Sequence, residues 1–274
     1  MSLLEAIVLG IVQGLTEFLP ISSTGHLRVV PAFLGWEDPG AAFTAVTQLG
    51  TMAAVLLYFR EDLWRIVRAW LASVPDRAKR RELDARIGWY IVLGTVPIGV
   101  FGVLFKDQIE TSARDLYVIG TTLIVLGLVL AAAEWVGTRD REIEQIQTKD
   151  GFVVGFAQAL ALIPGVSRSG ATITAGLFLG LNRAAAARFS FLLSVPAVVL
   201  SGLFELSSII EGEEGEHVGA GALIVATVLA FIVGYASIAF LLRFLANHST
   251  MVFVVYRVVL GAVVLALASA GVVE

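Results

Sequence analysis

Long apolar runs separated by short polar interruptions are the main pattern along this chain. Six runs come close to the roughly 20 residues that cross a bilayer. They lie at about 43–60, 87–105, 115–136, 186–206, 219–245 and 251–272. Because the runs are continuous and do not alternate apolar and polar positions, they predict spanning helices and argue against a barrel. We therefore expect an all-α polytopic membrane protein.

Two further apolar segments are too short to span and contain a polar break. Residues 3–19 lead to Pro20 and the polar turn 22–25, and a second short apolar piece follows. Residues 152–163 lead to the break PGVSRSG and to a short piece at 172–181. Each pattern predicts a re-entrant helical hairpin, which is tolerated only where protein or a wet cavity surrounds it.

The two halves of the chain form an internal repeat. Four residues of the first half recur in the second half at an offset of 145 (158 − 13). The matched pairs are Gly10 with Gly155, Gln13 with Gln158, Ser22 with Ser167, and Gly25 with Gly170. Each half holds one hairpin and three full spans, and since three is odd, the second copy must enter the membrane upside down. We predict one integral membrane domain, 1–274, built from inverted repeats 1–150 and 151–274.

Composition and charge agree with this picture. The chain is 57% hydrophobic and only 15% charged, whereas a soluble domain has roughly 25% charged residues. It has no cysteine, which excludes disulfides and thiolate metal sites. The basic loop at 61–86 is expected in the cytoplasm by the positive-inside rule, with both chain ends and the acidic 207–218 loop outside. The first thirty residues lack a basic start and carry Glu17, so we expect no cleavable signal.

The polar breaks carry the candidate chemistry. Glu17 lies one helical turn after Gln13, on the same face, and a glutamate at membrane depth costs about 3 kcal/mol. The second break supplies Arg168, whose planar guanidinium suits phosphate oxygens, and Ser167 and Ser169 are expected to hold that guanidinium. A carboxylate facing an arginine across hydroxyls, inside a bilayer, favours phosphate handling.

Each of these residues also has a purely structural interpretation. Serines and threonines in membrane helices often bond only to backbone or to neighbouring helices. Glu17 and Arg168 could form a buried salt bridge, and His26 could be a satisfied interfacial histidine. The occurrence of both polar breaks at matched repeat positions favours a functional site over these alternatives.

The two breaks resemble the signatures of one family. QGLTEFLPISSTGH, residues 13–26, resembles the first signature of the bacitracin-resistance type of undecaprenyl-diphosphate phosphatases, E/Q-x-x-x-E followed by P-x-S-S-T-G-H. PGVSRSGAT, residues 164–172, resembles the second, P-G-x-S-R-S-x-x-T. Gln13 stands where other members carry Glu. The resemblance implies a membrane enzyme that removes the terminal phosphate of the C55 polyprenyl diphosphate carrier, with a divalent cation, Mg²⁺ or Ca²⁺.

The resemblance also implies roles for the residues of both breaks. The expected catalytic residues are Glu17, Ser23, His26 and Arg168. The expected substrate-binding residues are Ser22, Thr24, Ser167, Ser169 and Thr172. The expected cation ligands are Gln13 and Glu17. The attacking group stays open between Ser23, His26 and water, and Ser23 is favoured.

The remaining expectations concern partners and alternatives. The expected partners are the lipid diphosphate and the bilayer of the bacterial plasma membrane. No nucleic acid is expected, and a homodimer is left open. The site is expected to face the outer side. A secondary transporter or lipid flippase shares the inverted-repeat logic and is the alternative function. A phosphatase with a histidine nucleophile fits less well, because His217 and His248 lie outside the breaks.

Overall fold

The computed structural model describes residues 1–105, 108–109, 115–210 and 219–273, and every regular element within these ranges is helical. The first half contains α1 (Leu3–Phe18), α2 (Ser23–Leu34), α3 (Gly40–Tyr58), α4 (Arg60–Ser73), η1 (Arg77–Arg81), α5 (Leu83–Leu104) and α7 (Leu116–Val136). The second half contains η2 (Ile143–Gln145), α8 (Thr148–Ala159), η3 (Leu160–Leu162), α9 (Arg168–Phe178), α10 (Arg183–Ile210), α11 (Ala220–Asn247) and α12 (Met251–Ser269).

Five of these helices are long and apolar enough to cross a membrane, namely α5, α7, the first part of α10, α11 and α12. A sixth span is reached if α3 and α4 are taken together, although they are bent by 74° at their junction. The prediction of a polytopic helical protein is confirmed. The acidic residues at 211–218, His217 included, lie outside the described residues.

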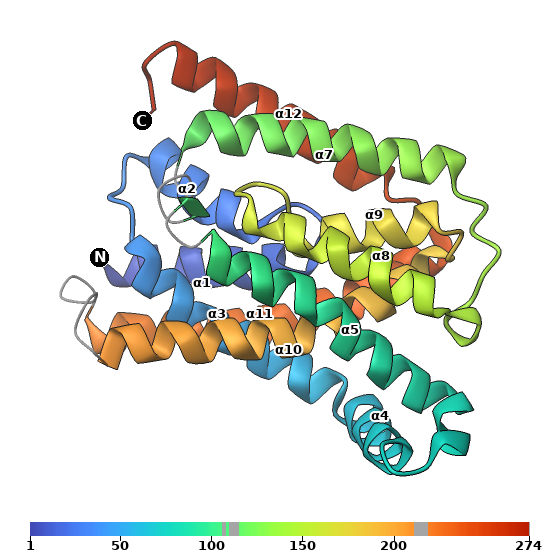
Figure 1. The fold of residues 1–274 in the computed structure, drawn as a ribbon. Coiled ribbons are helices and arrows are strands. Elements are labelled where there is room, and N and C mark those ends of the chain that lie inside the picture. Colours follow the sequence, from blue (N-terminus) through green and yellow to red (C-terminus); the bar gives the residue numbers. More distant parts are fainter. Residues whose placement is uncertain (106–107, 110–114, 211–218, 274) are drawn as a thin grey trace.

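The segment 61–86 is not the loop that its charge suggested. It contains α4 and η1 and the first turn of α5. The helix forms because one of its faces is apolar and packs on α5: Ile66 is buried, and the Trp70 ring lies 5.8 Å from the Trp89 ring. Figure 1 shows α4 at one end of the bundle, and both chain ends at the other.

The long helices pack in a regular scheme around the two helix–break–helix units (Figure 1). Helix α1 packs on α11, and α8 packs on α5. Helix α7 packs on α12, and α3 on α10. Helix α9, which follows the second break, contacts α7, α8 and α10. The breaks are thus enclosed by protein, as a polar interruption within a bilayer requires.

Two glycines at matched repeat positions allow close helix crossings. A Cβ on Gly10 would lie 2.5 Å from the Ala226 carbonyl oxygen of α11. A Cβ on Gly155 would lie 2.3 Å from the Gly94 Cα of α5. Any side chain at these positions would push the helices apart, because such distances are well inside van der Waals contact. Gly10 and Gly155 are one of the repeat-matched pairs.

Buried ion pairs join the helix ends on the α4 side of the bundle. The Glu134 carboxylate of α7 is buried and accepts hydrogen bonds from Arg183 of α10 and from the Thr250 hydroxyl at 2.7 Å. The Arg141 guanidinium pairs with the buried Asp150 carboxylate at 2.6 Å. The hydrogen bond with Asp150 raises the pKa of Arg141 above its usual value.

Candidate active site

The two breaks have the same backbone geometry. Ser22 is the N-cap of α2 with φ 76°, and its Oγ accepts a hydrogen bond from the Gly25 amide at 3.3 Å. Ser167 is the N-cap of α9 with φ 70°, and its Oγ accepts from the Gly170 amide at 3.1 Å. A positive φ at a non-glycine residue is strained by about 1–3 kcal/mol and tends to occur at functional sites. Both turns therefore present the N-terminus of a short helix, where an anion is favoured.

Glu17 joins the two breaks. Its Oε1 forms an ion pair with Nη2 of Arg168, which comes from the other half of the chain. Its Oε2 accepts a hydrogen bond from the Ser23 hydroxyl at 2.6 Å and from Gln13 Nε2 at 3.3 Å. The Glu17 side chain is only 7% exposed and Arg168 only 17%. A hydroxyl that donates to a buried carboxylate is the arrangement of a nucleophile with its base.

Within the described part of the chain, the second-break hydroxyls form no hydrogen bond with the Arg168 guanidinium, so the expectation that Ser167 and Ser169 hold it is wrong. Ser167 caps α9 instead, and Ser169 Oγ donates to the Leu19 carbonyl at 3.0 Å, linking the two breaks. Thr172 is fully buried and donates to the Arg168 carbonyl at 2.8 Å. These residues shape the break, because their hydroxyls are already used within the protein.

The side chain of Thr24 is the most exposed of the predicted substrate-binding residues. Its Oγ1 lies 3.4 Å from Ser22 Oγ. Ser22 itself is buried and serves as the cap. Of these two neighbouring hydroxyls, Thr24 is therefore the one placed to meet a ligand that enters the break.

His26 has both ring nitrogens engaged. Nδ1 lies 2.6 Å from the Ser22 carbonyl oxygen and must donate to it, since a carbonyl only accepts. In the neutral ring Nε2 then accepts from the Tyr256 hydroxyl, at 2.7 Å. The two rings are stacked, with an interplanar angle of 7°. This arrangement fixes the ring against the first break. Of the two candidate attacking side chains, Ser23 is therefore the one in contact with Glu17.

Arg257 was not singled out from the sequence, although an arginine inside the last apolar run is itself a signal of function. Its side chain is fully buried in α12. Its guanidinium donates to the Pro20 carbonyl of the first break at 3.2 Å. It also donates to the Gly165 and Val166 carbonyls of the second break at 3.1 and 3.0 Å. One side chain thus holds both turns in register and adds a positive charge beside them.

The donor set near Glu17 fits a divalent cation. Gln13 Oε1 is buried without a hydrogen-bond partner in the described protein. The Glu17 carboxylate lies next to it, because Gln13 Nε2 donates a hydrogen bond to Glu17. The Gln13 and Glu17 oxygens are ligands of the kind that Mg²⁺ and Ca²⁺ prefer. Among the described residues there is no group of three or more His, Asp or Glu that could hold a metal. The residues therefore suit a cation that completes its coordination with water and phosphate oxygens.

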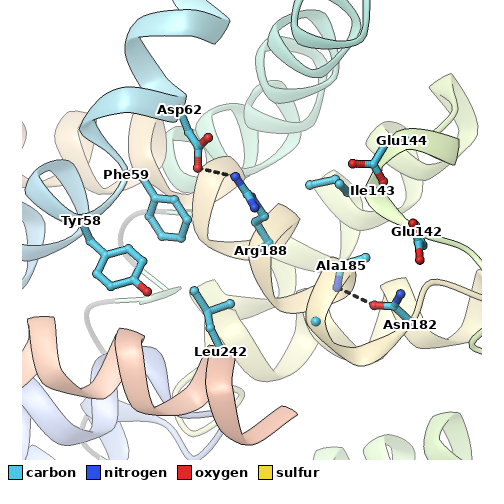
Figure 2. Close-up of a pocket in the computed structure, with 11 residues that line it drawn as sticks. Tyr58, Phe59, Asp62, Glu142, Ile143, Glu144, Asn182, Ala185, Arg188 and Leu242 are labelled. Atoms are coloured by element: carbon cyan, nitrogen blue, oxygen red, sulfur yellow. Dashed lines mark hydrogen bonds and ion pairs between the residues drawn. The ribbon is translucent and has the colours of Figure 1, made fainter. Parts of the chain in front are cut away.

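A separate cavity of about 450 Å³ opens on the α4 side of the bundle (Figure 2). Arg188 of α10 pairs there with Asp62 of α4 at 2.6 Å. Phe59 lines the cavity. Its ring lies 6.1 Å from that of Phe191, which lies 5.6 Å from that of Phe18 beside Glu17. Three buried aromatic rings in contact thus lead from the wall of this cavity to Phe18, the residue that follows Glu17.

Comparison with known proteins places this geometry in context. A family model described as "Bacitracin resistance protein BacA" matches residues 6–263. The chain is 53% identical to an undecaprenyl-diphosphatase of Nocardia farcinica, over 100% of this chain and 98% of the relative. It is 56% identical to proteins with the same name from Nocardioides sp. (98% of both chains) and Mycolicibacterium smegmatis (99% of both). Both signature breaks lie within the matched region.

Proposed function

The chain belongs to the bacitracin resistance protein BacA family, and from this premise we propose that it is an undecaprenyl-diphosphatase whose reaction takes place between the two breaks. The family resemblance of its signatures is confirmed. The enzyme removes the terminal phosphate of undecaprenyl diphosphate and so returns the monophosphate carrier for cell-wall synthesis. The transporter alternative is not favoured, because the relatives are named as diphosphatases.

The observation that carries the proposed mechanism is the 2.6 Å hydrogen bond from Ser23 to Glu17. Ser23 Oγ attacks the terminal phosphorus while its proton passes to Glu17. The bond from that phosphorus to the bridging oxygen breaks, and the lipid monophosphate leaves. Water then attacks the phosphoserine, which restores Ser23 and releases inorganic phosphate together with the proton.

Arg168 binds the diphosphate in this proposal. In the structure its guanidinium pairs with Glu17, so an arriving phosphate competes for the same donors. A planar fork can hold oxygens of both phosphorus atoms and stabilise the charge of the transferring group. The amides at the starts of α2 and α9, with Thr24, add donors for the anion.

Gln13 and Glu17 would hold the divalent cation, Mg²⁺ or Ca²⁺, against the phosphate oxygens. When bound, it would neutralise charge on the diphosphate. His26, fixed by Ser22 and Tyr256, would keep the first break in place and stays the second candidate for attack or for activation of water. Ser22, Ser167, Ser169 and Thr172 would act through the shape of the breaks.

The helix packing supports inverted repeats. In chain order within each half, α3 corresponds to α10 and α7 to α12, and each of these pairs is in contact. Helix α5 corresponds to α11, and each packs on the first short helix of the other half. Such an exchange is what a pseudo-two-fold axis produces. We propose one domain, 1–274, with repeats 1–150 and 151–274 related in this way.

The protein is a multi-pass membrane protein, and we propose that it resides in the bacterial plasma membrane. The side carrying α4 would be cytoplasmic by its arginines. The polar breaks would open to the outer side, away from the cavity of Figure 2. Its partners would be the lipid diphosphate and the bilayer, with a homodimer left open.

The experiment measures phosphate release by purified protein from a lipid diphosphate labelled with ³²P on the terminal phosphate. After acid quench, we expect label on the wild-type chain and none on Ser23→Ala, and a fall in kcat of roughly 10²–10⁴-fold for Glu17→Gln. Thr24→Ala, which removes the neighbouring hydroxyl, is the matched control and should still be labelled. Turnover of Ser23→Ala within about threefold of wild type would exclude the serine route; no phosphate release by wild type would exclude the function.

A further inference from the structure

Helix α4 has two apolar faces, and only one of them is used by the fold. The first face carries Ile66, Trp70 and Ser73 and packs on α5. The Ser73 hydroxyl accepts a hydrogen bond from Trp89 Nε1 at 3.0 Å, and Trp70 lies against Gly88. This contact fixes how α4 is rotated about its own axis.

The second face is a row of large apolar side chains that the described protein does not cover. It consists of Trp64, Val67, Leu71 and Val74, spaced three, four and three residues apart, which places them on one side of a helix. All four are exposed, Trp64 by 65% and Leu71 by 55%. We call this row the α4 stripe. In water such a row would be unfavourable.

The bend at the start of α4 gives the stripe its orientation. Helix α4 leaves α3 at 74°. If α3 crosses the bilayer, α4 lies nearly in the plane of its surface (Figure 1). A helix in that plane, with an uncovered apolar face and basic residues beside it, has the form of an interfacial membrane helix.

Basic residues border the stripe. The Arg68 guanidinium lies 5.7 Å from the centre of the Trp64 ring. Beyond the helix, η1 presents Arg77, Lys79 and Arg81, all exposed and none in an ion pair within the described residues. Arg80 points the other way and donates to the Ser73 carbonyl at 3.1 Å, which anchors the turn. The side chains of Arg77, Lys79 and Arg81 are therefore left exposed on this turn.

We propose that the α4 stripe and η1 form a docking surface for anionic phospholipids. The stripe enters the acyl-chain boundary, and Arg77, Lys79 and Arg81 bind the headgroup phosphates. Charge complementarity selects this occupant over a second copy of the chain, because a two-fold contact would bring like charges together. The surface lies at the opposite end of the bundle from the chain termini and uses no residue of the breaks (Figure 1).

The test uses Trp64 as the reporter. The full chain is reconstituted in vesicles of phosphatidylcholine and phosphatidylglycerol, with bromine on the acyl chains of only one of the two lipids. Bromine quenches tryptophan fluorescence on contact, and the Trp64 signal is the difference between wild type and Trp64→Phe. Both leaflets have the same composition, so the orientation of the protein does not matter.

In wild type, we expect brominated phosphatidylglycerol to quench Trp64 more than its mole fraction predicts, and salt to reduce the excess. Each basic residue near an anionic surface favours association by roughly fivefold. Arg77→Gln with Lys79→Gln should therefore lower the preference by fivefold or more. Arg243→Gln with Lys149→Gln removes the same two charge types elsewhere and should leave it unchanged.

Several outcomes would overturn the proposal. Equal quenching by the two brominated lipids in wild type would mean that no headgroup is selected. An equal loss of preference in the control variant would mean that net charge, and not η1, attracts the lipid. Absence of Trp64 quenching by either lipid would mean that protein covers the stripe. Unchanged phosphatase turnover of the η1 variant in detergent shows that it is folded.

Discussion

At the scale of single residues, the Glu17–Arg168 pair can be a structural salt bridge or part of the catalytic machinery, and a substitution of Arg168 distinguishes the two. Arg168→Lys keeps the charge but replaces the planar fork by a compact ammonium, which cannot hold two phosphate oxygens in the same way. If the transition-state contact is worth about 3–4 kcal/mol, kcat should fall by roughly 10²–10³-fold. Most of the effect should be in kcat, because the lipid tail still supplies ground-state binding.

A structural pair predicts a different result. If Arg168 only neutralised Glu17, lysine would restore much of the activity, and Glu17→Gln with Arg168→Gln would be stable and partly active. Turnover of Arg168→Lys in detergent within about threefold of wild type, with unchanged thermal stability, would therefore contradict a phosphate clamp.

Arg257 allows a second prediction at this scale. Lysine at this position keeps the charge but cannot reach carbonyls on both breaks at once. A shift of about 1 Å between Ser23 and Arg168 is enough to slow turnover by roughly 10²-fold. We expect this loss in kcat for Arg257→Lys, measured per folded molecule and with a smaller change in KM.

Arg183→Lys is the matched control for Arg257. Arg183 also joins helices, although it is only partly buried, and it binds Glu134 at the far end of α7. Its replacement should lower the melting temperature with little effect on kcat. If Arg257→Lys behaves in the same way, Arg257 only stabilises the fold and does not position the breaks.

The residues of the site could be predicted from the sequence only in part. The signatures identify Glu17, Ser23 and Arg168, and the structure brings these three together. The signatures do not show whether a hydroxyl faces the ligand or is hydrogen-bonded within the protein, because this depends on packing. Thr172, for example, belongs to the second signature but is fully buried. Arg257 was missed although an arginine within an apolar run is a signal in itself. Its link to the breaks could not be predicted, because its partners are backbone carbonyls far away in the chain.

At the scale of helices, the close crossings are the most sensitive feature. Gly155→Ala would place a methyl group 2.3 Å from the Gly94 Cα, so α5 and α8 must separate. Overpacking of this kind destabilises by about 1–3 kcal/mol, and the melting temperature should fall. Gly99→Ala is the control on α5, because a Cβ there meets nothing within 4 Å. Equal stability of both variants would contradict the crossing.

Helix positions were largely predictable, because apolar runs of about twenty residues have few alternatives in a membrane protein. The predicted span at 115–136 agrees with α7, Leu116–Val136, to one residue at its start. Helix α4 was not predicted. Its arginines indicated a loop, whereas its apolar residues, at helical spacing, favour a helix once α5 is there to pack against.

At the scale of the whole molecule, the proposed topology can be tested with single cysteines, since the chain has none of its own. Lys79→Cys in η1 should react with a membrane-impermeant thiol reagent only after the cells are opened. Glu37→Cys, in the exposed segment between α2 and α3, should react in intact cells. Labelling of position 79 from outside intact cells would reject this orientation.

The row of rings formed by Phe18, Phe191 and Phe59 has a consequence for the energy supply of the cell. A plasma membrane stores energy as a proton gradient, and any continuous file of water across it would discharge that store. Here a titratable carboxylate lies beside Phe18, and a cavity containing Asp62 lies beside Phe59. The Phe18 and Phe191 rings meet edge to face and the Phe191 and Phe59 rings are tilted, so buried apolar side chains are packed against one another along this row. In a protein that spans a membrane, such apolar packing between two acidic groups would oppose the formation of a continuous file of water.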